Sequence, residues 1–126
     1  WGPGRWAADI AAAQDAIADA TGVLPRFFRP PFGVRTPLLE PALAKTGVHC
    51  VTWSARAYDT VARDSARVLA RLAPQLEAGA IVLLHDGVAT ARRRRPSVLP
   101  EVAPSVLALL AERGWHSVTL RAACAE

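Results

Sequence analysis

A continuous apolar run at residues 80–84 (AIVLL) is the clearest strand candidate in the chain and sets its fold class. A strand with no alternating polar residues needs cover on both faces, and such strands are typical of parallel sheets. His85, Asp86 and Gly87 follow the run directly. The run therefore predicts a buried parallel strand with polar groups at its carboxyl end.

Helical and strand-like segments alternate along the rest of the chain. The expected strands are 27–28, 48–53, 80–84 and 115–120, and residues 54–63 form a polar loop. The expected helices are 6–20, Thr36 to near Gly47, Asp64 to about Ala78, and Ser97 to Gly114. Each of the last three begins with a residue type that favours the N-cap. This alternation, in steps of about 30 residues, predicts an α/β fold with about four parallel strands.

The composition is that of one folded domain spanning residues 1–126. Apolar residues make up 52% of the chain, which excludes a disordered segment. No run of about 18 apolar residues occurs, so no membrane segment is expected. Cys50 and Cys124 are too few for a disulfide framework and lack zinc-ribbon spacing. The chain begins with Trp1 rather than Met, so it looks cut from a longer protein, and a cytoplasmic and a secreted location both stay open.

The net charge of +4 includes one run of four arginines, Arg92 to Arg95. Such a run can attract phosphate, so binding to nucleic acid is one alternative function. No aromatic residues are interleaved with it, which favours a solvated loop and no nucleic-acid partner. A generic phosphate-binding α/β domain is a weaker alternative, because the chain has no Gly-x-Gly-x-x-Gly or Walker-type loop.

Three polar side chains fall at or just after expected strand ends: Arg29, Asp59 and His85. Because the carboxyl ends of parallel strands lie side by side, these side chains can meet. His85 suits a general acid or base, and a carboxylate beside it would fix its tautomer. Arg29 lies on a segment stiffened by tandem prolines and suits holding a carboxylate.

Each candidate also has a purely structural interpretation. His85 could satisfy loop backbone, Asp59 could cap a turn, and Arg29 could lie on the surface of a proline-rich turn. Arg56 could reach the same cleft, pair with Asp59, or be a solvated loop charge. Taken singly, none of these residues decides between catalysis and structure.

Together they resemble the polysaccharide deacetylases, the NodB-homology family or carbohydrate esterase family 4. RFFRPPFG at 26–33 is similar to the family's arginine–proline motif, and TWSARAYDT at 52–60 to its Trp-x-x-x-x-x-Asp segment. GAIVLLHDG at 79–87 resembles its Leu-x-His motif. The resemblance extends from about residue 6 to residue 120 and implies a partial (β/α) barrel.

The resemblance implies a metal-dependent hydrolase that removes acetyl groups from N-acetylated sugars or polysaccharides, with zinc the usual metal. His85 would be the general acid, Asp59 would orient it, and Arg29 would hold the catalytic base. The backbone N–H near Phe32 would stabilise the oxyanion, and Leu83 would line the pocket for the acetyl methyl group. Arg56 suggests a subgroup with its own substrate preference.

The motifs that would supply the base and the metal ligands, Thr-Phe-Asp-Asp and His-x-x-x-His, do not occur in this sequence. We expect both to precede Trp1, so no metal site is assigned, and His49 and His116 are interpreted as structural. Phe32 stands where tyrosine is commoner, and Thr60 where many members have tryptophan. We expect residues 1–126 alone to be poorly stable and inactive. The alternative is a non-catalytic, carbohydrate-binding remnant of the same fold.

Overall fold

The computed structural model describes residues 2–62, 64–87 and 96–125, which divide into two compact units. The first ends at Thr52 and the second begins at Trp53. Each unit has its own buried apolar cluster and its own pair of parallel strands. In the described part of the chain, no helix is both long and apolar enough to cross a membrane.

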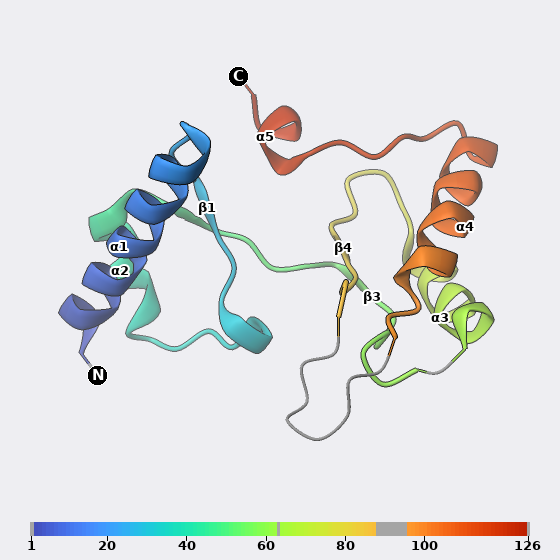
Figure 1. Ribbon diagram of the computed structural model, residues 1–126, viewed down its shortest axis with the longest axis horizontal. Helices are drawn as coiled ribbons and strands as arrows, with labels where there is room; N and C mark the ends of the chain where they lie inside the picture. Colours follow the sequence, from blue (N-terminus) through green and yellow to red (C-terminus); the bar gives the residue numbers. More distant parts are fainter. Residues whose placement is uncertain (1, 63, 88–95, 126) are drawn as a thin grey trace. The chain divides into compact units, whose positions relative to one another are not determined.

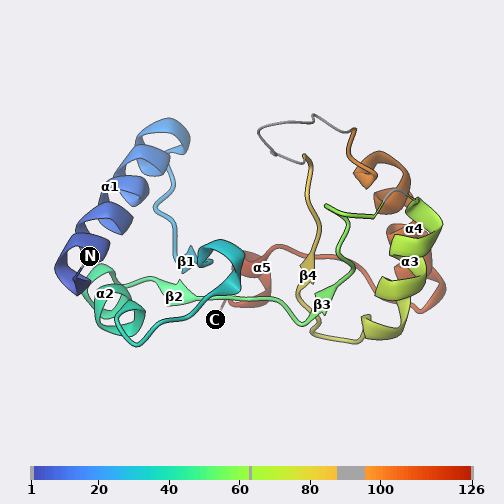
Figure 2. The same cartoon turned by 90° about the horizontal axis from the view of Figure 1, so that it is seen from below.

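The first unit packs two helices beside a short parallel strand pair (Figures 1 and 2). Its elements are α1 (Pro3–Thr21), β1 (Phe27–Phe28), a 3₁₀ turn (Pro31–Gly33), α2 (Leu39–Thr46) and β2 (His49–Cys50). Phe27 lies opposite His49 in the ladder. The apolar face of α1 packs on α2, and the buried cluster consists of Ala7, Ile10, Leu39, Ala42, Leu43 and Val48. The predicted helix and strands are confirmed here, although β2 is shorter than the expected 48–53.

The predicted N-cap at Thr36 is wrong, because α2 begins at Leu39. The Thr36 carbonyl accepts from the Leu39 N–H at 3.0 Å, which closes a turn around Pro37 before the helix starts. The Thr36 hydroxyl is buried and has no hydrogen-bond partner among the described residues, so it caps nothing.

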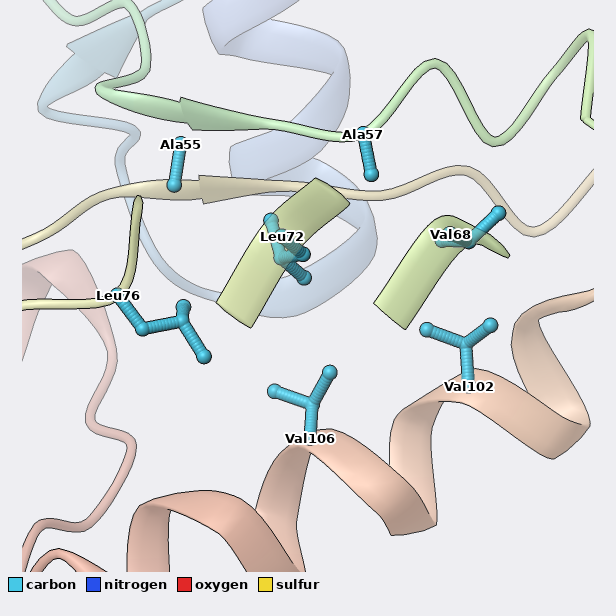
Figure 3. Close-up of a cluster of buried hydrophobic side chains, with 7 residues drawn as sticks. All are labelled: Ala55, Ala57, Val68, Leu72, Leu76, Val102 and Val106. Atoms are coloured by element: carbon cyan, nitrogen blue, oxygen red, sulfur yellow. The ribbon is translucent and has the colours of Figure 1, made fainter. Parts of the chain in front are cut away.

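The second unit places two strands against two helices (Figure 1). Its elements are β3 (Ala55–Arg56), α3 (Ser65–Leu72), a 3₁₀ turn (Ala73–Gln75), β4 (Val82–Leu83), α4 (Leu99–Glu112) and α5 (Leu120–Ala123). β3 runs parallel to β4, with Ala55 opposite Val82 and Arg56 opposite Leu83. The core between strands and helices is Ala55, Ala57, Val68, Leu72, Leu76, Val102 and Val106 (Figure 3).

Two element boundaries before β4 differ from those expected, and one is confirmed. The predicted polar loop at 54–63 contains β3, and both Ala55 of β3 and Ala57, which directly follows it, are fully buried. The predicted helix to Ala78 stops at Leu72, since Pro74 cannot donate the next helical hydrogen bond. Asp64 does cap it, accepting from the Ala66 N–H at 2.9 Å.

The chain after α4 also differs from the prediction. The expected final strand at 115–120 is wrong: residues 115–119 are irregular and Leu120 begins α5. A β-strand forms by backbone hydrogen bonding to a neighbouring strand, and no strand among the described residues pairs with residues 115–119. Ser97 is not the N-cap of α4, since that position is Val98, but its hydroxyl accepts from the Leu99 N–H at 3.1 Å.

The run at 80–84 is not covered on both faces by the described residues. Val82 and Leu84 pack against the core, whereas Leu83 is half-buried and takes no part in it. In β3 and just after it, Ala55 and Ala57 likewise face the core, so the intervening Arg56 lies on the opposite face. Each strand of this pair therefore has a covered face and an open face.

Truncating Leu72 is expected to destabilise the second unit strongly, because its side chain is fully buried between strands and helices. We expect Leu72→Ala to lower the free energy of unfolding by about 2–5 kcal/mol. Leu107→Ala, on the exposed side of α4, removes the same atoms and should change it by less than about 0.5 kcal/mol. If chemical denaturation showed that both variants lose the same free energy of unfolding, this assignment of the core would be contradicted.

Candidate active site

The second unit joins Asp59 and His85 through both oxygens of one carboxylate. Asp59 Oδ2 accepts from the His85 backbone N–H at 2.6 Å. Asp59 Oδ1 lies 3.0 Å from His85 Nδ1. The aspartate side chain is 2% exposed and the histidine side chain 38% exposed. The predicted meeting of these two residues is therefore present in the fold.

The local backbone explains why the carboxylate points inward. Tyr58 adopts a left-handed conformation, with φ of 56°, directly before Asp59. Its carbonyl accepts from the N–H groups of Val61 and Ala62, each at 3.1 Å, which closes the turn. This turn follows β3 and places the Asp59 carboxylate against His85, two residues after the end of β4.

His85 is held from the other side by the segment before α4. Ser97 Oγ donates to the His85 carbonyl at 2.9 Å and accepts from the Leu99 N–H. Both backbone polar groups of His85 are thus bonded, one to Asp59 and one to Ser97. The position of the histidine in the turn is fixed independently of its ring.

This arrangement has a definite chemical consequence for the imidazole. With Nδ1 facing a buried carboxylate, the proton on that nitrogen is retained by Asp59, and Nε2 is the nitrogen that remains for a ligand. The pair can deliver a proton from a defined, partly exposed atom, as a general acid must.

Arg56 does not pair with Asp59, contrary to one interpretation of the sequence. Its guanidinium lies over two aromatic rings, with Cζ 4.3 Å from the ring centroid of Tyr58 and 5.5 Å from that of Trp53. Its backbone is clamped by Gln75, which accepts from the Arg56 N–H at 3.0 Å and donates to its carbonyl at 2.9 Å. Among the described residues, both oxygens of the Asp59 carboxylate contact His85.

Leu83 and Phe32, the other predicted substrate-binding residues, lie in different units. Leu83 is half-buried on β4, opposite Arg56 and two residues before His85. Phe32 lies in the turn after β1, is 92% exposed and has a left-handed φ of 57°. Gly33, also left-handed, provides the unusual turn that the sequence predicted there.

Arg29 belongs to the first unit, at the end of β1. Its Nη2 donates to the Thr52 carbonyl at 3.3 Å, and the residue is exposed. It lines a largely apolar pocket of about 550 Å³ together with Trp6, Asp9, Phe28 and Thr36. Its role toward a carboxylate stays a prediction.

The described residues do not fit a metal ion. They contain no group of three or more His, Cys, Asp or Glu side chains that could hold one. His49 and His116 are exposed, and Cys50 and Cys124 are free thiols. Arg92 to Arg95, the run considered for nucleic-acid binding, lies outside the described residues.

Three contributors to this site were missed from the sequence. Ser97 was expected only to cap a helix, although it also bonds His85. Gln75 lay inside a predicted helix, so nothing in the sequence indicated the two hydrogen bonds from its side chain to the backbone of Arg56. Tyr58 lies within the quoted WSARAYDT segment, but a left-handed tyrosine cannot be recognised from residue type.

No family model matches the chain, but two curated proteins do. One is the bifunctional xylanase/xylan deacetylase of Cellvibrio japonicus, 33% identical over 79 residues, or 63% of this chain and 12% of that protein. The other is the chitooligosaccharide deacetylase of Bradyrhizobium sp. (strain ANU 289), 35% identical over 80 residues, or 63% of this chain and 36% of that protein. The chain thus spans well under half the length of either relative.

Solved structures match over nearly the whole chain. A family 4 carbohydrate esterase from Streptomyces lividans, in complex with acetate, has a TM-score of 0.80 and 27% identity, covering 95% of this chain and 58% of that one. A family 4 acetyl xylan esterase from Clostridium thermocellum, with a cobalt ion, has a TM-score of 0.79 and 25% identity, covering 96% and 55%. A mutant family 4 pseudoenzyme with restored activity, 21% identical, shares the fold with a TM-score of 0.76.

Proposed function

We propose that this chain belongs to the polysaccharide deacetylases of carbohydrate esterase family 4. In this proposal it supplies the general acid of an active site that hydrolyses the acetamide group of an N-acetylated sugar. The observation that carries the proposal is the buried Asp59 carboxylate, which holds both the backbone and the ring of His85. The names of the relatives support an acetylated saccharide as the substrate.

Amide hydrolysis needs an acid because an amine is a poor leaving group. Water adds to the acetyl carbon, and the carbon–nitrogen bond then breaks to give acetate and a free amine. We assign to His85 the donation of the Nε2 proton to the departing nitrogen. Asp59 retains the proton on Nδ1 and balances the charge of the imidazolium until the transfer occurs.

The remaining residues have supporting roles in this proposal. Leu83, half-buried on the open face of β4, would contact the acetyl methyl group. The N–H near Phe32 would donate to the oxyanion, and Arg29 would hold the catalytic base. Arg56 would influence which sugar is accepted.

The divalent metal expected for the family would need ligands from outside the described residues. One structural relative was solved with cobalt, whereas our prediction for this protein is zinc. The base and the metal ligands would come from the rest of the full-length protein, so residues 1–126 alone should release no acetate. Adding zinc to the 126-residue chain and detecting steady acetate release would contradict this division of the site.

The assay that tests the function follows acetate and free amine together. We expect the full-length protein to release them in equal amounts from an oligomer of N-acetylglucosamine. Acetylated xylan serves as the comparison, because its acetyl groups are esters, so hydrolysis releases acetate and leaves a sugar hydroxyl rather than a free amine. Binding of either saccharide with no acetate release would contradict the enzyme and favour the non-catalytic, carbohydrate-binding alternative.

A further inference from the structure

Two residues other than glycine have a left-handed backbone among the described residues, and both are exposed aromatics. Phe32 has φ of 57° and is 92% exposed, and Tyr58 has φ of 56° and is 52% exposed. A bulky side chain in this region costs about 1–3 kcal/mol and is found mainly at functional sites. The family resemblance already implies a role for the N–H near Phe32, whereas it implies none for Tyr58.

Folding alone does not account for a tyrosine at position 58. The turn uses only its backbone, through the carbonyl that accepts from Val61 and Ala62. Its ring takes no part in the buried core. Glycine or asparagine would form the same turn at lower cost, because each tolerates a positive φ. The tyrosine therefore occupies this turn at a conformational cost.

The ring is also fixed in place from one side. The guanidinium of Arg56 lies over it at 4.3 Å, and Gln75 fixes the backbone of Arg56. An aromatic ring that is already ordered loses little entropy when a ligand packs on it. Half of the tyrosine remains accessible to solvent, so a surface for such a ligand exists.

The position of the ring relates it to the chemistry. Tyr58 directly precedes Asp59, whose carboxylate holds His85. The face of an aromatic ring carries partial negative charge and attracts the weakly positive C–H groups that line one side of a sugar ring. A pyranose packed on Tyr58 would lie beside the pair that we assign to proton donation.

We propose that Tyr58 is a sugar-stacking residue of this site, and that the guanidinium of Arg56 holds its ring in position. The inference rests on the proposed deacetylase function and adds to it a residue that binds the saccharide rather than transferring a proton. It also explains why the turn before Asp59 carries a strained aromatic residue.

Tyr58→Gly separates this role from a structural one, because it should move stability and binding in opposite directions. In the full-length protein, removing the positive-φ strain should leave the thermal midpoint unchanged or higher. Loss of the ring should raise KM for an N-acetylglucosamine oligomer by about tenfold, with little change in kcat. Tyr58→Phe, which keeps the ring, should retain the wild-type KM.

Val61→Ala is the matched control, since Val61 is exposed in the same turn and contributes only its backbone N–H to it. It should change neither KM nor the thermal midpoint. A wild-type KM in Tyr58→Gly, or a lower thermal midpoint, would overturn the stacking role while leaving acetate release by the wild type intact. No acetate release by the wild type would instead refute the proposed function, and this inference with it.

Discussion

His85→Ala is expected to lower acetate release from an N-acetylated oligosaccharide by about 10²–10⁴-fold in the full-length protein. The loss should fall on kcat, because the imidazole acts on the departing nitrogen rather than on the ground-state substrate. His85 closes its turn through its backbone, bonded to Asp59 and Ser97, so removing the ring should leave the turn in place.

The leaving group provides an internal check on this assignment. An aryl acetate releases a phenolate that needs no proton, so its hydrolysis should fall far less in His85→Ala than that of the acetamide. His116→Ala removes an exposed histidine from the same unit and should leave both rates unchanged. An equal loss on both substrates would show that His85 does not act as the acid.

Asp59→Asn is expected to reduce the same activity by at least about 10²-fold, although the two side chains have the same shape. The carboxylate accepts from both the backbone N–H and Nδ1 of His85. An amide offers one oxygen and one N–H donor, so one of these two bonds must be lost or reversed. If the amide donates to Nδ1, the proton moves to Nε2 and the imidazolium loses its counter-charge.

The matched control for Asp59→Asn is Asp64→Asn. Asp64 caps α3 through one oxygen, and asparagine is about as good an N-cap as aspartate. This substitution should change neither activity nor stability by a measurable amount. Asp59→Asn should also lower the free energy of unfolding by about 1–3 kcal/mol, because a buried polar contact is left unmatched. Full activity in Asp59→Asn would contradict the role of the carboxylate.

The sequence predicted the α/β class and the partial deacetylase-type fold, and the solved relatives confirm both. The apolar run at 80–84 located β4, and the helix stop at Gly22 and the cap at Asp64 lie where expected. These features depend on local chemistry, such as glycine at a positive φ and a carboxylate accepting from a free N–H. Local rules of this kind can be read from residue type.

Features set by tertiary contacts were harder to predict. β3 was missed because alanine has low strand propensity, and Ala55 of β3 is held in place by packing in the core with residues of α3 and α4. The expected strand at 115–120 has suitable residues but no partner among those described. The approach of Asp59 to His85 was predicted from strand ends alone, whereas the left-handed turn that produces it was not.

In the proposed site, Asp59 fixes the ring of His85 with its proton on Nδ1 and with Nε2 directed to the substrate. Nitrogen-15 NMR of the histidine ring, at a pH where the ring is neutral, measures this directly. We predict that His85 is the Nδ1–H tautomer in the wild type and loses that preference in Asp59→Asn. A neutral His85 that carries its proton on Nε2 in the wild type would contradict the account.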